Sequence, residues 1–186
     1  PDQIPALPKK IEELVGRPYK EVAFEIIGAF FTDYTKEELV ACVENAYANS
    51  FSKKEITPVK KVDDIYVLEL FHGPTCAFKD VALTLLPQLM SCALKTTNQK
   101  ALILTATSGD TGKAALSGFC DVENIGINVF YPYKKVSAIQ YRQMVTQKGN
   151  NVNVSDLKLE VRINLHLDSF HLVWLACWKR FGVRLL

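Results

Sequence analysis

The chain has 186 residues, 48% of them apolar and 23% charged, which is ordinary usage for a globular domain with one hydrophobic core. A formal net charge of +2 excludes a strongly basic nucleic-acid-binding surface, and no apolar stretch is long enough to span a membrane. We therefore expect neither a nucleic-acid nor a membrane partner.

Residues 1–60 read as a helical lead-in with three amphipathic segments. The third opens with Thr35 and Glu38, which are spaced as a capping box. Beyond this lead-in, strand-like and helix-like runs alternate with short links, which predicts an α/β protein whose parallel sheet is flanked by helices. The expected helices span 9–15, 19–31, 36–48, 81–94 (kinked at Pro87), 111–119 and 137–147, and the expected strands span 65–71, 101–107, 125–131 and 152–154.

The segment from His72 to Asp80 (HGPTCAFKD) lies between a strand-like run and a helix-like run. Gly73 and the proline after it predict a tight turn, so the Lys79 amine is held at the junction. Apolar neighbours would make this amine a usable nucleophile toward an aldehyde. The alternative is an ordinary Lys–Asp pair on a solvated loop.

A second junction follows the strand expected at 101–107. The turn comprises Ser108, Gly109, Asp110, Thr111 and Gly112, and it leads directly into a helix of small residues. Such turns aim backbone N–H groups and hydroxyls at a carboxylate or phosphate. Asp110 or Thr111 could instead simply cap the helix. In an open parallel sheet, both junctions would lie along the carboxyl edge, where ligands bind.

Three ordered motifs closely resemble threonine synthase: HGPTCAFKD, then ATSGDTG at 106–112, then YPYKKVSAIQYRQM at 131–144. The resemblance covers residues 1–154 and implies a fold type II enzyme that uses pyridoxal 5'-phosphate. It implies Lys79 as the Schiff-base lysine. It also implies that the turn 108–112 holds the substrate carboxylate and faces the cofactor ring, with Ser108 and Thr111 as donors. Lys113 and Lys134 depart from the family pattern.

The function implied by this resemblance is conversion of O-phospho-L-homoserine and water to L-threonine and phosphate, a carbon–oxygen lyase reaction on a small phosphorylated amino acid. Freed Lys79 would move protons between the α and β carbons. His72 would orient a phosphate or hydrogen-bond within its own turn. Two alternatives stay open: a threonine-synthase-like phospholyase that eliminates phosphate, and a non-enzymatic binding or signalling isoform.

Residues 155–186 do not align with this family, so we expect an unrelated tail of splice, frame-shift or cloning origin, with a strand at 159–167 and a helix at 169–181. The family's glycine-rich phosphate loop would lie beyond residue 186. We therefore expect a truncated chain that binds its cofactor weakly, is inactive alone and self-associates through exposed apolar surface.

The five cysteines, at positions 42, 76, 92, 120 and 177, are odd in number and form no CxxC pair. This usage argues against both a disulfide framework and a zinc or other metal site. The cytoplasm or another reducing compartment is the expected location.

Overall fold

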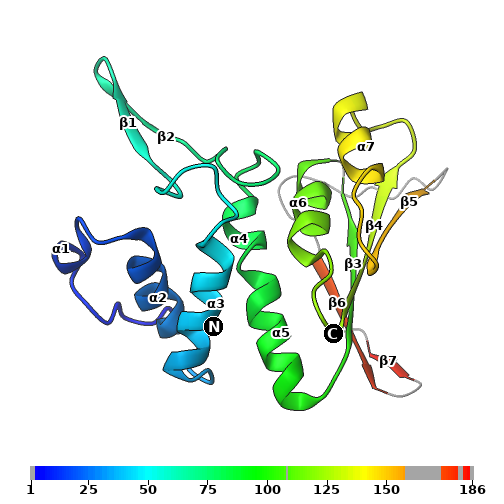
Figure 1. Cartoon of the computed structure of the whole chain (residues 1–186), viewed down its shortest axis with the longest axis horizontal. Coiled ribbons are helices and arrows are strands. Elements are labelled where there is room, and N and C mark those ends of the chain that lie inside the picture. Colours follow the sequence, from blue (N-terminus) through cyan, green and yellow to red (C-terminus); the bar gives the residue numbers. More distant parts are fainter. Residues whose placement is uncertain (1–2, 108, 158–172, 180–181, 185–186) are drawn as a thin grey trace. The chain divides into compact units, whose positions relative to one another are not determined.

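A computed structural model of the chain describes residues 3–107 and 109–157, together with the backbone of residues 173–179 and 182–184 (Figure 1). The chain is an α/β protein and divides into two compact units, Pro1–Cys92 and Ala93–Leu186. The first unit is mainly helical, and the second contains the main sheet. The predicted α/β class, with parallel strands flanked by helices, is confirmed.

The first unit begins with helices α1 (Ile11–Leu14), α2 (Tyr19–Phe30) and α3 (Lys36–Tyr47). The predicted capping box opens α3. The Thr35 hydroxyl accepts a hydrogen bond from the Glu38 N–H at 3.2 Å, and the Glu38 carboxylate accepts from the Thr35 N–H at 2.8 Å. These bonds satisfy two donors at the amino end that the helix itself cannot pair.

Two tyrosine hydroxyls tie the helices of this unit together. Tyr47 donates to the Val81 carbonyl at 2.8 Å, and Tyr34 donates to the Leu89 carbonyl at 2.9 Å. Both rings thus combine apolar packing with a satisfied polar group. The surrounding core consists of Ala23, Leu39, Cys42, Val43, Ala46, Tyr47, Ile56, Leu85 and Leu89.

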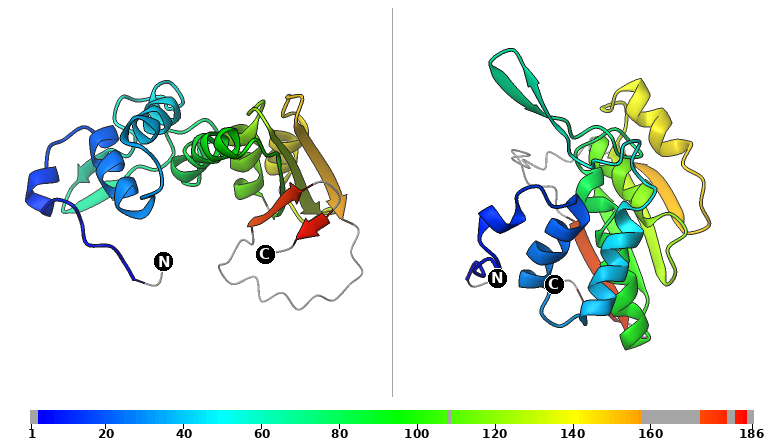
Figure 2. Two further views of the ribbon diagram at one scale, coloured as in Figure 1. Left: turned by 90° about the horizontal axis from the view of Figure 1, so that it is seen from below. Right: turned by 60° about the vertical axis from the view of Figure 1, so that its left-hand side comes forward.

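The strand expected at 65–71 is not part of the parallel sheet. Strand β2 (Ile65–Leu68) pairs antiparallel with β1 (Val59–Val62), and all eight residues of this hairpin are exposed. Asp63, at the turn, has a φ of 52°, the left-handed conformation that tight hairpins use. The hairpin projects from the helices of the first unit (Figures 1 and 2). The prediction of a parallel strand was wrong because it missed β1.

The helix predicted at 81–94 is divided in two. Helix α4 (Asp80–Leu83) ends before Pro87, and α5 (Leu86–Thr97) begins immediately before that proline. Proline lacks an N–H and clashes with the preceding turn in a helix interior, but it fits the first turn of a new helix. The helix is therefore interrupted between Leu83 and Leu86, and not merely kinked at Pro87 as expected.

The sheet of the second unit has the order β5-β4-β3-β6-β7 (Figure 2). Strands β3 (Ala101–Ala106), β4 (Ile125–Pro132) and β5 (Val152–Leu157) run parallel, as predicted. Strands β6 (Val173–Lys179) and β7 (Gly182–Arg184) extend the sheet antiparallel beyond β3. The helix expected at 169–181 is therefore wrong over β6, whereas the strand expected at 159–167 falls outside the described residues.

Helices α6 (Asp110–Phe119) and α7 (Ala138–Val145) pack on one face of this sheet. Alternate residues of β4, from Ile125 to Tyr131, are buried on that face. The Gly112 backbone of α6 approaches both Val129 of β4 and Met144 of α7, and both of these side chains are fully buried. This packing fixes the start of α6 at the carboxyl end of β3.

Candidate functional site

Lys79 immediately precedes α4 and has the backbone angles of a right-handed helix. Its side chain is half-buried, and Nζ lies 4.7 Å from the centroid of the Phe78 ring. The Phe78 side chain is 59% exposed, so the amine lies beside an aromatic face that solvent still reaches. Within residues 3–107 and 109–157, no ion pair involves Lys79.

The turn before Lys79 is built around the Asp80 carboxylate, which is buried. Thr75 donates to this carboxylate twice, through its hydroxyl at 2.6 Å and its N–H at 2.8 Å. The Ala77 N–H lies 3.4 Å from the same group. Sequence analysis considered Asp80 only as the acidic partner in a Lys–Asp pair and did not identify this network, although Thr75 and Asp80 both belong to the HGPTCAFKD motif.

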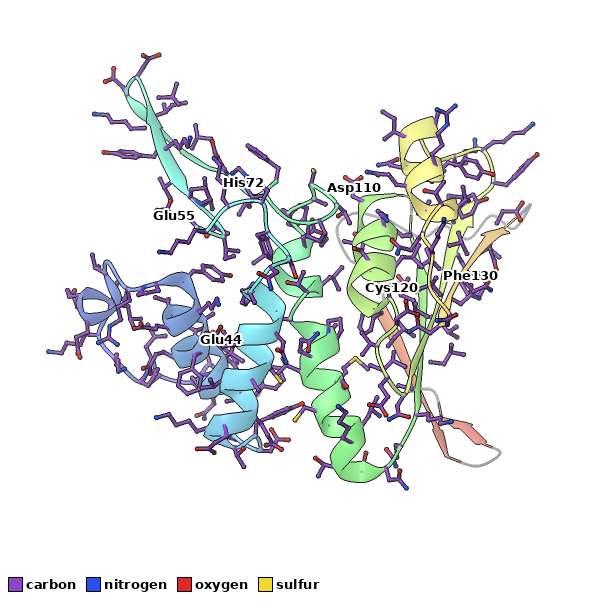
Figure 3. All side chains as sticks on the ribbon, viewed as in Figure 1. Glu44, Glu55, His72, Asp110, Cys120 and Phe130 are labelled. Atoms are coloured by element: carbon purple, nitrogen blue, oxygen red, sulfur yellow. The ribbon has the colours of Figure 1, made fainter. Side chains whose placement is uncertain are left out.

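His72 lies in the segment between the hairpin and α4 (Figure 3). Its Nε2 is 2.6 Å from the Glu69 carboxylate, and its Nδ1 is 3.5 Å from the Ser52 hydroxyl. The hydrogen bond with His72, together with nearby Lys53 and Lys60, holds the pKa of Glu69 below its usual range. Of the two roles considered for His72, these contacts fit local hydrogen bonding.

The second predicted site is the turn 108–112, of which Ser108 lies outside the described residues. Gly109 precedes α6, and its N–H donates to the Thr107 hydroxyl at 3.2 Å. Of the residues that the structure describes, none caps this helix with its side chain. Asp110 is exposed in its first turn, and Thr111 is 7% exposed. The N-terminus of α6 thus presents the backbone donors that favour an anion.

Gln140 of α7 covers this turn. Its Nε2 donates to the Asp110 carboxylate at 2.9 Å, and its Oε1 accepts from the Ser137 N–H at 3.2 Å. A Cβ placed on Gly109 would lie 2.4 Å from the Gln140 amide, so the absence of a side chain lets the amide approach. Sequence reasoning did not identify Gln140, although Ser137 and Gln140 have the spacing of a capping box.

Gly112 completes the turn by close packing. A Cβ at this position would lie 2.3 Å from Thr107 Cγ2 and 2.9 Å from Val129 Cγ1. The residue must therefore be glycine for α6 to approach the strands this closely.

The two junctions differ in what precedes them. The turn 109–112 follows β3 of the main sheet, whereas the Lys79 turn follows an antiparallel hairpin that belongs to the other unit. The expectation that both would follow strands of one parallel sheet is therefore wrong. The assignment of Lys79 and of Ser108 to Gly112 as functional residues does not depend on that expectation.

In the described part of the chain, Cys42, Cys76, Cys92 and Cys120 form no disulfide bond. Burial raises the pKa of Cys42 to about 11. The same described residues contain no cluster of three or more His, Cys, Asp or Glu that could hold a metal ion. None of their helices is long and apolar enough to cross a membrane.

Comparison with known proteins agrees with the resemblance to threonine synthase. Residues 1–47 match the family model described as the threonine synthase N terminus. The chain is 36% identical to the threonine synthase of Pseudomonas aeruginosa over 156 residues, which are 82% of this chain and 33% of that protein. It is related to the threonine synthases.

Two further proteins extend the comparison. The PLP-bound threonine synthase from Brucella melitensis superposes with a TM-score of 0.74 and 36% identity, over 80% of this chain and 32% of that one. Human threonine synthase-like 1 is 36% identical over 149 residues, 75% of this chain and 20% of that protein. The chain therefore spans about a third of the length of the threonine synthases that it matches.

The two positions that depart from the threonine synthase motifs are accommodated locally. Lys134 has a φ of 56°, a conformation that glycine adopts at little cost. The Lys113 ammonium extends from α6 and donates to the Gln147 side-chain oxygen.

Proposed function

We propose that the protein to which this region belongs is a threonine synthase that converts O-phospho-L-homoserine and water to L-threonine and phosphate. The observation that carries the proposal is the presence of both the Lys79 segment and the turn at α6 in a chain homologous to the threonine synthases. The substrate is then a small phosphorylated amino acid.

Lys79 is the proposed attachment point for pyridoxal 5'-phosphate, with Ser108 and Thr111 facing the cofactor ring. A half-buried primary amine at a fixed helix start, outside the ion pairs of the described residues, suits covalent attachment to an aldehyde. When bound, the cofactor supplies an electron sink for the carbanion. The Lys79 amine would remove protons from the α and β carbons of the substrate. Once phosphate has left the γ carbon, it would return protons at the γ and α carbons, while water supplies the hydroxyl group at the β carbon.

The turn 108–112 is proposed to bind the substrate carboxylate. Among the described residues no side chain caps helix α6, so its first N–H groups are available to an anion. The Ser108 and Thr111 hydroxyls would add donors to these N–H groups. The Gln140–Asp110 hydrogen bond and the close packing at Gly112 would hold the turn in place for the carboxylate.

We further propose that the 186-residue chain alone does not turn over. It spans about a third of the length of the related enzymes, and charge-assisted hydrogen bonds to a cofactor phosphate normally come from a dedicated loop. A reversible covalent link at Lys79 alone would hold the cofactor weakly. The described cysteines are thiols that form no disulfide bond, which suits a reducing compartment such as the cytoplasm.

A chimera tests the reaction. Residues 1–154 would replace the matching segment of the Pseudomonas aeruginosa threonine synthase, and threonine and phosphate would be measured with O-phospho-L-homoserine. The proposal expects both products in equal amounts, and their loss with Lys79→Ala. Phosphate without threonine would instead support the phospholyase alternative.

A further inference from the structure

The Asp80 carboxylate is the best-buried polar group in the Lys79 segment, because the residue is only 1% exposed. Burial of a carboxylate is costly unless hydrogen bonds replace the lost water. Here Oδ1 accepts from the Thr75 hydroxyl at 2.6 Å, and Oδ2 accepts from the Thr75 N–H at 2.8 Å. Both oxygens are therefore engaged by the turn that leads to Lys79.

Gly73 makes room for this carboxylate. A Cβ at Gly73 would lie 2.4 Å from Asp80 Cβ and 2.5 Å from Oδ2. Any other residue at this position would have to displace Asp80 or the turn. The glycine that sequence analysis assigned to a tight turn thus also admits the carboxylate.

Helix α4 has four residues and is too short to be stable by itself. Its backbone is held by neighbours on either side: the Asp80 N–H donates to the Ala77 carbonyl at 3.0 Å, and the Thr84 hydroxyl donates to the Asp80 carbonyl at 2.8 Å. The geometry of Lys79, which stands between the turn and this helix, depends on these contacts.

We infer that Asp80 is the positioning residue for Lys79, because its buried carboxylate fastens the turn 73–78 to the start of α4 and so fixes the backbone from which the lysine amine projects. The inference rests on the proposed function of Lys79. Asp80 itself needs no contact with cofactor or substrate. Its effect is to restrict the directions that the Lys79 side chain can take, which favours reaction at a defined aldehyde.

Two threonines provide a matched pair for testing this role. Thr75 and Thr84 are each 8% exposed, and each donates one hydroxyl hydrogen bond to Asp80. Thr75 binds the side-chain carboxylate, whereas Thr84 binds the backbone carbonyl. A merely structural role would make Thr75→Val and Thr84→Val equivalent, whereas a positioning role acts through Thr75 only.

The experiment uses the 186-residue chain, incubated with pyridoxal 5'-phosphate, reduced with borohydride and mapped by peptide mass spectrometry. The measured quantity is the labelling rate at Lys79 divided by the rate at exposed Lys36. Asp80→Leu leaves the Thr75 donors unpaired, and we expect this ratio to fall about tenfold, with a smaller fall for Thr75→Val. Asp80→Asn, Thr75→Ser and Thr84→Val should keep the ratio within about twofold, because an amide oxygen still accepts from N–H and serine still donates.

Each outcome decides the question. A fall for Thr75→Val that Thr84→Val does not share supports positioning, even where Asp80→Leu fails to fold. Equal ratios for these two variants overturn the inference. If the unaltered chain still labels Lys79 faster than Lys36, the proposed function of Lys79 stands. If the unaltered chain labels Lys79 no faster than Lys36, the proposed anchor fails, and the positioning role fails with it.

Discussion

The Lys79 turn and the turn at α6 look alike in sequence, since each joins a strand-like run to a helix-like run, yet they are built differently. The turn at α6 is fixed by the main sheet, because it follows a buried parallel strand and packs Gly112 against Thr107 and Val129. The Lys79 turn follows an exposed hairpin and is fixed by a buried carboxylate. Backbone packing orders the turn at α6, whereas side-chain hydrogen bonds order the Lys79 turn.

This difference predicts which substitutions each turn tolerates. The turn at α6 should be much more sensitive to added volume than to loss of the exposed Asp110 carboxylate, whose hydrogen bond with Gln140 lies at the surface. The Lys79 turn should be sensitive to loss of a hydrogen-bonding group. The predictions below examine this contrast.

The largest expected effect on stability comes from adding side-chain volume at the start of α6. Gly112→Ala places a methyl group 2.3 Å from Thr107 Cγ2. The overpacking should lower the free energy of unfolding by about 2–3 kcal/mol, measured by urea denaturation. Gly28→Ala in α2 is the control, because its nearest neighbour would be 3.7 Å away, and there we expect a gain of about 0.5–1 kcal/mol. Equal effects at the two glycines would show that close packing does not fix α6.

The next effect concerns anion binding at the same turn. In the chimera with the Pseudomonas aeruginosa enzyme, Thr111→Val removes a hydroxyl without changing side-chain volume. A lost donor to a charged partner costs about 1.5–2 kcal/mol, so KM should rise about 10- to 30-fold. The cofactor absorbance should stay unchanged, and Thr111→Ser should restore KM. An unaltered KM in Thr111→Val would leave this residue with a purely structural role.

A smaller effect concerns the ion pairs beside the Lys79 turn. The pKa of Glu69 is lowered in the folded chain, chiefly by its hydrogen bond with His72. The Glu69 carboxylate therefore stabilises the fold above the unfolded pKa of about 4.3, and this stabilisation is lost as the pH falls through the lowered pKa. The urea midpoint of the unaltered chain should therefore exceed that of Glu69→Gln at pH 7 and converge with it toward pH 3. Parallel curves over this range would contradict the role of the Glu69–His72 contact.

The sequence predicted those features that depend on local pattern. Thr35 and Glu38 were identified as a cap because the reciprocal bonds involve residues three positions apart. The strand-like run at 125–131 and the small residues at 111–119 predicted one strand and one helix of the second unit, which are β4 and α6. Lys79 was identified by its place between a turn and a helix start, and it occupies that place.

Other features depend on pairing between segments, which local pattern does not encode. The exposed segment 59–62 contains two lysines between valines and was not identified as a strand, so its partner 65–68 was assigned to the wrong sheet. An Asp-Asp pair between two such runs was the available hairpin signal. The Asp80 network was missed because its burial follows from Gly73 and Thr75 folding back onto the helix start.

Mapping the site of cofactor attachment tests the central claim most directly. The chain would be incubated with excess pyridoxal 5'-phosphate, reduced with borohydride and digested, and the adduct would be located in the unaltered chain and in Lys79→Arg. The account predicts one dominant adduct at Lys79 that disappears in the variant, with no other lysine labelled to the same extent. Labelling spread evenly over the surface lysines, unchanged by the substitution, would contradict it.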